Sequence, residues 1–249
     1  MRQKLVAGNW KMHGDSQSIR ELLTALKPAV AESAAEIAVI PPLVYVPLCA
    51  DLLAGSSIAL GAQTVSEQRN PGAFTGEVCA DMLADSGCRY TLVGHSERRS
   101  LYGENDALVA AKTEAALAAN VLPIVCVGET KEQREAGATL DVVGQQIDVV
   151  LSTLNSGHDK ITVAYEPVWA IGTGLTASPE QAQEVHAFIR TRLAAHSAEL
   201  ADTVRILYGG SVKAANAAEL FAQPDIDGGL VGGASLDAEE FAAICNAIG

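Results

Sequence analysis

A repeated alternation of short apolar runs and helical patterns constrains the fold of this sequence more than any other feature. The runs that we interpret as strands start roughly 20 to 45 residues apart, which leaves room for one crossover helix after each. Most of them lack a polar residue at every second position, as expected of strands that are buried on both faces. The candidate strands are Leu5–Trp10, Ile37–Ile40, Ile58–Gln63, Tyr90–Gly94, Leu122–Val127, Ile161–Tyr165, Arg205–Tyr208 and Asp227–Val231. We therefore predict an α/β protein in which eight strand–helix units close into a (β/α)8 barrel rather than an open sheet.

The segments between the candidate strands carry helical patterns. We predict helices at Ser16–Val30, Asp106–Ala119, Ala138–Leu154 and Ser178–Ala195. The last of these has a clear start, because Ser178 can cap the helix, Pro179 suits its first position and Gln181 can complete a capping box. The chain has 249 residues and no linker, charge block or low-complexity segment, and barrels of this kind typically contain about 250 residues. Residues 1–249 are therefore expected to form a single barrel domain.

Composition and charge limit the partners of the protein. The formal net charge of −13 argues against nucleic acid and against an anionic membrane surface. The N-terminal apolar run is too short for a signal peptide, and the longer stretch from Ile37 to Ala50 is broken by prolines and too short to span a bilayer. The five cysteines form no C-x-x-C pair, which favours reduced thiols and a cytoplasmic protein.

A barrel of this type places its active site at the carboxyl ends of the strands. Polar residues and glycines gather at the predicted strand ends. They are Asn9, Lys11, Gln63, His95, Cys126–Glu129, Glu166, Gly209–Ser211 and Gly232–Gly233. Because the eight strand ends meet at one mouth of the barrel, we expect these residues to surround a common site.

Glu166 is the candidate catalytic base. It follows the apolar run Ile161–Tyr165 directly, which places a carboxylate at a strand end. The apolar loop behind it, from Pro167 to the glycines at 172 and 174, is suited to act as a hinged lid. The alternative interpretation is an ordinary Glu in a surface turn followed by a buried loop.

His95, Lys11 and Asn9 could complement such a base. His95 precedes the predicted start of a short helix at Ser96, and a helix N-terminus disfavours positive charge, so we expect His95 to be neutral. Lys11 offers a fixed cation and Asn9 a hydrogen-bond donor. One carboxylate base with neutral and cationic donors suits removal of a proton beside a carbonyl, because the donors stabilise the enediolate oxygen. The other four histidines are interpreted as structural residues.

Two glycine-containing segments follow the last two strands. Gly209-Gly210-Ser211 and Gly232-Gly233 can bring backbone N–H groups close to an anion. The corresponding loops of barrel enzymes commonly bind phosphate, so a small phosphorylated substrate is predicted.

Cofactor and metal sites are not indicated. The run Gly172-Thr-Gly174-Leu-Thr-Ala177 matches a dinucleotide-binding pattern, but it does not lie directly between a strand and a helix, and no acidic residue stands at the expected ribose position. The sequence contains no H-E-x-x-H and no cysteine cluster. We therefore predict neither a cofactor nor a metal.

Seven blocks distributed over nearly the whole chain resemble the triosephosphate isomerase family. They are Gly8-Asn-Trp-Lys-Met12, Gly72-Ala-Phe-Thr-Gly-Glu77, Val93-Gly-His-Ser-Glu-Arg-Arg99, Cys126-Val-Gly-Glu129, Ala164-Tyr-Glu-Pro-Val-Trp-Ala-Ile-Gly-Thr-Gly174, Tyr208-Gly-Gly-Ser-Val212 and Leu230-Val-Gly-Gly-Ala-Ser235. The resemblance implies a TIM barrel that needs no cofactor and interconverts dihydroxyacetone phosphate and glyceraldehyde 3-phosphate. Together the blocks are far more specific than any one of them.

The resemblance also implies a role for each matched residue. Glu166 would move a proton between the two carbons, while His95 would polarise the carbonyl. Lys11 and Asn9 would bind the substrate, with Glu97 as a supporting carboxylate near Lys11. The residues implied in binding the phosphate through backbone N–H groups are Gly172, Ser211, Gly232 and Gly233, with Gly172 contributing after the lid closes. Cys126 is implied to be structural.

A long loop after the third predicted strand suggests assembly. Thirteen residues, Thr64 to Gly76, precede an expected helix start near Glu77, and loops of that length are usually functional or disordered. Phe74 beside its tip would be costly in a monomer but useful in an interface. The family resemblance implies a homodimer in which Thr75 enters a pocket beside Asn9, Lys11 and His95 of a second subunit; the alternative is a mobile surface loop.

Two other functions fit parts of the pattern. A phosphate-binding lyase or aldolase would use Lys11 to form an imine with its substrate. A barrel without catalytic activity could serve as a scaffold, although it would need no set such as Lys11, His95 and Glu166.

Overall fold

The computed structural model describes residues 2–170 and 177–248. Within them eight parallel strands form a closed barrel in the order of the chain, and β1 pairs with both β2 and β8. The strands are β1 (Leu5–Asn9), β2 (Glu36–Ile40), β3 (Ala59–Ala62), β4 (Cys88–Val93), β5 (Leu122–Val127), β6 (Thr162–Tyr165), β7 (Arg205–Tyr208) and β8 (Gly228–Val231). The predicted (β/α)8 barrel is confirmed, and every strand agrees with its predicted bounds to within two residues.

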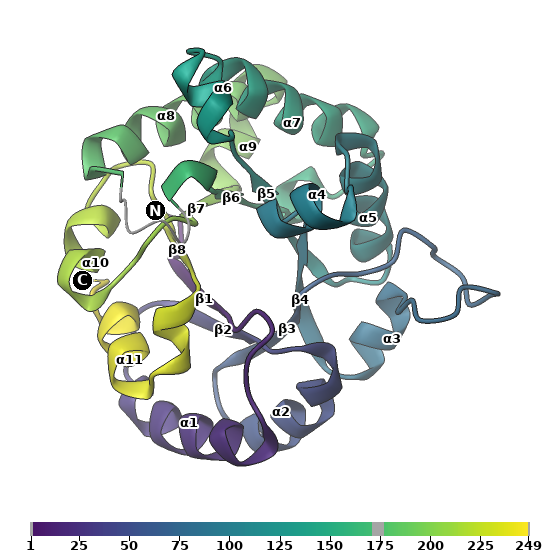
Figure 1. Ribbon diagram of the computed structural model, residues 1–249, viewed down its shortest axis with the longest axis vertical. Coiled ribbons are helices and arrows are strands. Elements are labelled where there is room, and N and C mark those ends of the chain that lie inside the picture. The colour runs from purple at the N-terminus through teal and green to yellow at the C-terminus, as the bar shows by residue number, and fades with distance from the viewer. Residues whose placement is uncertain (1, 171–176, 249) are drawn as a thin grey trace.

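Helices surround the barrel as an outer ring (Figure 1). They are α1 (Ser16–Ala29), α2 (Val46–Leu53), α3 (Ala80–Asp85), α4 (Ser96–Tyr102), α5 (Asp106–Ala118), α6 (Lys131–Glu135), α7 (Thr139–Thr153), α8 (Pro179–His196), α9 (Ala198–Thr203), α10 (Ala214–Phe221) and α11 (Ala238–Asn246). Short 3-10 turns are η1 (Leu43–Tyr45), η2 (His158–Lys160), η3 (Val168–Ala170) and η4 (Gly233–Leu236).

The start of α8 has the predicted capping box. The hydroxyl of Ser178 accepts the amide N–H of Gln181 at 3.2 Å, and the side-chain oxygen of Gln181 accepts the amide N–H of Ser178 at 3.0 Å. These two bonds satisfy donors that the first turn of a helix leaves unpaired. Pro179 stands at the first helical position, as expected.

Two apolar layers explain why the strands lack polar alternation. Successive strand residues point to opposite faces, so in β1 Leu5 and Ala7 lie in the barrel interior while Val6 packs in the layer beneath the helices. The interior layer also holds Tyr90 and Leu92 of β4. Both faces are buried, and both therefore need apolar side chains.

A charged cluster fills the barrel at the amino ends of the strands. The guanidinium of Arg205, the first residue of β7, donates to Glu36 Oε2 at 2.6 Å and to the Tyr90 hydroxyl at 3.0 Å. That hydroxyl donates in turn to Glu36 Oε1 at 2.6 Å. The interior is thus packed rather than open, and the residues predicted to be functional lie at the opposite, carboxyl ends of the strands.

The loop after β3 is longer than the sequence indicated. The predicted helix start near Glu77 is wrong, because α3 begins at Ala80. The amide of Ser66 donates to the carbonyl of Val78 at 2.9 Å, which ties the two ends of the loop together and keeps Val78 out of the helix. Figure 1 shows this loop projecting from the barrel beside α3. Among the helices of the described ranges, none is both long and apolar enough to cross a membrane.

Candidate active site

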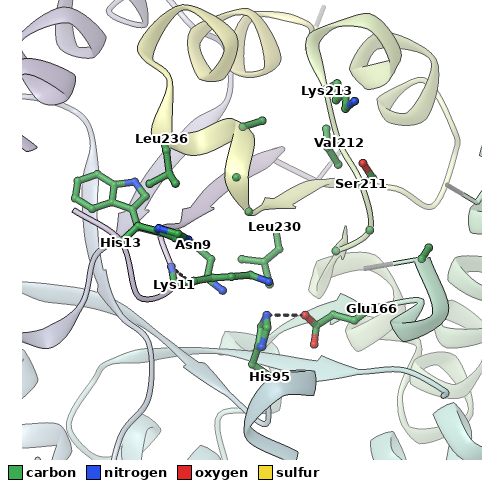
Figure 2. A pocket seen from close by; sticks show the side chains of 17 residues that line it. Asn9, Lys11, His13, His95, Glu166, Ser211, Val212, Lys213, Leu230 and Leu236 are labelled. Atoms are coloured by element: carbon green, nitrogen blue, oxygen red, sulfur yellow. Dashed lines mark hydrogen bonds and ion pairs between the residues drawn. The ribbon is translucent and has the colours of Figure 1, made fainter. Parts of the chain in front are cut away.

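A cavity of about 320 Å³ opens at the carboxyl ends of the strands (Figure 2). The structure brings together there most of the polar residues that were predicted from separate parts of the sequence, but Gln63 and Cys126–Glu129 do not line this cavity. Its lining includes Asn9, Lys11, His95, Glu166, Gly209, Gly210, Ser211, Gly232 and Gly233. Of the predicted site residues, Gly172 lies outside the described ranges, as does all of the predicted lid beyond Ala170.

Glu166 is buried at the end of β6, with only 2% of its surface exposed. Its amide N–H donates to the carbonyl of Val127 at 2.7 Å, so the β5–β6 ladder continues through Glu166. Both carboxylate oxygens have partners. Oε1 lies 2.9 Å from Nε2 of His95, and Oε2 accepts the amide N–H of Ser96 at 2.8 Å.

His95 caps helix α4. Its Nδ1 accepts the amide N–H of Glu97 at 3.2 Å, which leaves the ring proton of the neutral imidazole on Nε2, where it can donate to Glu166. The predicted short helix therefore exists, and His95 lies at its N-terminus. The sequence carried no signal for the Ser96 amide as a partner of Glu166, because that contact depends on how two distant strands meet.

The charge state of His95 reflects opposing influences. Burial lowers the pKa of this imidazole, but the nearby charge of Glu166 and its hydrogen bond raise it more, so the pKa lies above its usual value. The Glu97 amide at Nδ1 favours the neutral ring that the sequence analysis expected. Glu166 instead favours the protonated ring, because its negative charge raises the pKa of His95. The sequence did not indicate that these two side chains would come into direct contact.

Lys11 lines the cavity and has an unusual backbone conformation. Its φ angle is 49°, in the left-handed region that side chains other than glycine seldom adopt. The amide N–H of Lys11 donates to Asn9 Oδ1 at 3.0 Å, and its carbonyl accepts from Gln63 Nε2 at 2.7 Å. Such strain persists where surrounding bonds determine the conformation. The Lys11 ammonium contacts Glu97 Oε1 at 2.5 Å.

The two glycine-containing segments line the cavity together. A Cβ atom on Gly209 would approach Cγ of Glu166 to 2.9 Å, and one on Gly210 would approach the Tyr208 hydroxyl to 2.2 Å, so side chains are excluded there. A Cβ on Gly232 would lie 3.6 Å from Cε of Lys11, whereas one on Gly233 would meet nothing within 4 Å. Gly232 is thus close to the Lys11 side chain.

Glu129 is a buried carboxylate whose partners the sequence did not reveal. It accepts hydrogen bonds from the Tyr165 hydroxyl at 3.1 Å, from Trp169 Nε1 at 3.0 Å and from Arg134 at 3.2 Å. These bonds connect the end of β5 with β6 and with η3, the 3-10 turn that follows Glu166. Its place at a strand end was the only sequence signal that could have singled it out.

Within residues 2–170 and 177–248 no three His, Cys, Asp or Glu side chains are grouped in a way that could hold a metal ion. All five cysteines belong to the described part of the chain, where they are free and buried. Burial raises the pKa of the Cys126 thiol, which makes this residue an unsuitable nucleophile.

Comparison with known proteins places the chain in a family. The family model described as triosephosphate isomerase matches residues 4–248. The triosephosphate isomerase of Thiobacillus denitrificans is 62% identical over 248 residues, which cover 99% of both chains. Those of Pseudomonas paraeruginosa and Pseudomonas fluorescens are 56% and 54% identical over 250 residues, which cover each chain completely. This chain therefore belongs to the triosephosphate isomerase family.

Proposed function

We propose that this chain catalyses the reversible interconversion of dihydroxyacetone phosphate and D-glyceraldehyde 3-phosphate, the isomerase step of glycolysis and gluconeogenesis, by proton transfer through an enediolate. One observation carries the proposal most directly. The Glu166 carboxylate lies 2.9 Å from the His95 imidazole in a cavity that Lys11 and both glycine-containing segments also line. Full-length similarity to triosephosphate isomerases supports the same assignment.

Glu166 acts as the base in this proposal. Its carboxylate takes a proton from C1 of dihydroxyacetone phosphate, and the C–H electron pair becomes the C1–C2 double bond. The carbonyl electrons move onto the C2 oxygen, which becomes the enediolate oxygen. Return of the proton to C2, together with proton exchange between the two oxygens, yields the aldehyde. One carboxylate can serve both carbons because they are adjacent.

His95 and Lys11 stabilise the charge that develops on oxygen. The Nε2–H of His95 donates to the carbonyl oxygen in place of Glu166 and mediates the proton exchange between O1 and O2. The Lys11 ammonium offsets the negative charge of the substrate, and Asn9 donates a further hydrogen bond. Glu97, in contact with Lys11 at 2.5 Å, holds that ammonium at the mouth of the site.

The phosphate group is held by backbone N–H groups of Ser211, Gly232 and Gly233, with Gly172 joining them. The open space at Gly233 and the short approach of Gly232 to Lys11 support this position. A local anion site of this kind is needed because a net charge of −13 does not attract a phosphorylated substrate from a distance.

We further propose that the protein is a homodimer. The loop that contains Thr75 projects from the barrel, and Phe74 beside it is 43% exposed. An aromatic side chain in that position gains apolar burial when a second subunit covers it. Thr75 would enter the partner's pocket beside Asn9, Lys11 and His95. Each subunit would keep its complete catalytic set, braced by its neighbour.

The same proposal includes a single domain over residues 1–249 and a cytoplasmic location. The closed order of the strands supports the first, since β8 completes the barrel by pairing with β1. Five free, buried cysteines support a reducing compartment.

A coupled assay with glyceraldehyde 3-phosphate tests the activity. The purified protein, treated with a chelator and supplied with no cofactor, should produce dihydroxyacetone phosphate at a rate proportional to its concentration. Absence of turnover would leave a scaffold role for the barrel. Sodium borohydride added with substrate tests the aldolase alternative, because reduction would trap an imine on Lys11. The isomerase should remain unlabelled.

A further inference from the structure

Glu166 is held by more than its side-chain bonds, and the additional support comes from the neighbouring strand. Gly128 follows β5 directly, beside Glu166 in the extended β5–β6 ladder. On one side of Gly128, Val127 accepts the amide N–H of Glu166, and on the other side Glu129 accepts that of Val168 at 3.3 Å. The Gly128 peptide is therefore enclosed between two bonds that run to the Glu166 segment.

The approach of the two backbones is unusually close. A Cβ atom at Gly128 would lie 1.8 Å from the carbonyl oxygen of Glu166 and 2.8 Å from its carbonyl carbon. No side chain fits in that space, so the backbone of Glu166 rests directly against Gly128. A displacement of the Gly128 peptide must move the Glu166 backbone, and with it the carboxylate.

Gln146 binds both backbone polar groups of Gly128. This residue projects from α7, and its Oε1 accepts the amide N–H of Gly128 at 2.8 Å while its Nε2 donates to the carbonyl of the same glycine at 3.2 Å. Paired bonds to both polar groups of one residue fix its position and its orientation. Gln146 itself is largely buried, with 9% of its surface exposed.

A second pocket lies beside Glu166, and Gly128 and Gln146 also line it. This pocket has a volume of about 270 Å³ and is separate from the cavity described above. The hydrogen bonds of Gln146 add to the two backbone bonds in keeping the Gly128 peptide, and the backbone resting on it, in place.

We propose that Gln146 is a positioning residue for the isomerisation, acting through the Gly128 peptide on the catalytic base. This inference rests on the proposed role of Glu166. Gln146 touches neither substrate nor reacting atoms. It keeps the Glu166 carboxylate at the distance from the substrate carbon that proton transfer needs, and a misplacement of about 1 Å can cost on the order of a hundredfold in rate.

Gln146→Met removes both hydrogen bonds and preserves the length of the side chain. We expect kcat to fall about tenfold, with KM changed by less than about twofold, because the phosphate loops are untouched. Gln145→Met is the matched control: it is the same substitution one residue earlier on α7, at an exposed position. Its kcat should equal that of the parent. Gln146→Glu retains the acceptor for the Gly128 amide but places a carboxylate oxygen against the Gly128 carbonyl where the Nε2 donor was, so its kcat should also fall below that of the parent.

A double-mutant cycle separates positioning from general structural support. If Gln146 acts through the carboxylate, Gln146→Met should lower the residual kcat of a Glu166→Gln protein by less than about twofold. An equal loss in both backgrounds would overturn the proposal, as would full kcat in Gln146→Met. Near-normal kcat in the Glu166→Gln single variant would instead overturn the proposed base. Should Gln146→Met fail to fold, the same cycle with Gln146→Glu decides the question.

Discussion

Nε2 of His95 and Oε1 of Glu166 are 2.9 Å apart, although the two residues follow different, non-adjacent strands of the barrel. Each group changes the chemistry of the other. The carboxylate raises the pKa of the imidazole against the lowering effect of burial. The imidazole and the Ser96 amide together provide partners for both carboxylate oxygens.

Replacing the carboxylate should therefore have two separate effects. Glu166→Gln keeps the shape of the side chain and removes the base, so kcat should fall by at least about a hundredfold while inorganic phosphate binds as before. The pKa of His95 should also fall, because burial continues to lower it while the charge that raised it is gone. Steady-state kinetics measures the fall in kcat, and NMR titration of the imidazole measures the change in the pKa of His95. Retention of near-normal kcat would remove Glu166 from the mechanism.

Gly233→Asp tests the phosphate site by charge rather than by size. A Cβ at this position meets nothing within 4 Å, so a side chain fits. The carboxylate should repel the phosphate dianion and weaken binding of phosphoglycolate, a mimic of the charged intermediate, by at least about a hundredfold. Gly233→Asn is the neutral control of nearly equal size, and it should bind far more tightly than the Asp variant. Similar affinity of both for phosphoglycolate would place the phosphate elsewhere.

Thr75→Arg tests the proposed dimer. The substitution would put a bulky cation into the partner's pocket, where Lys11 already carries positive charge, and it should yield monomers with much reduced activity. Thr75→Ser preserves the size and the hydroxyl and should remain dimeric. Sedimentation of both proteins distinguishes the outcomes. A fully active dimer of the Arg variant would show that this loop tip does not anchor the interface.

His186 should make stability depend on pH. It lies buried on α8 against the rings of Tyr165 and Tyr208, and burial lowers the pKa of its imidazole to about 4 from 6.5. The unfolded chain therefore binds a proton below pH 6.5 that the folded chain does not bind until about pH 4. Stability is complete above pH 6.5 and is lost as the pH falls through this window.

The size of this effect can be isolated with His186→Asn, which keeps a donor near the Nδ1 position for the Asp225 carbonyl and carries no titrating group. Between pH 8 and pH 5 the parent should lose about 2 kcal/mol more of its unfolding free energy than the variant. Urea unfolding at the two pH values measures the difference. Equal losses would show that His186 does not titrate as its burial implies.

The strands and the longer helices could be predicted because their signals are local. Apolar runs such as Leu122–Val127 and the capping residues around Ser178 act within a few residues, and the structure has these elements where they were expected. The start of α3 was missed for the opposite reason. Its position depends on a bond between Ser66 and Val78, which lie far apart in the chain and meet only when the loop closes.

The sequence by itself determined the fold class, the mouth of the barrel where the polar residues meet, and the residue types available there. Strand alternation and strand ends are properties of short segments, so they can be read before the chain folds. Only the tertiary structure decided that Glu166 contacts His95 and Ser96, that Lys11 is held at a φ of 49°, and that Gln146 reaches Gly128. Hydrogen bonds and pKa values change over fractions of an ångström and with burial, and both are defined only once eight separate strands have closed into one barrel.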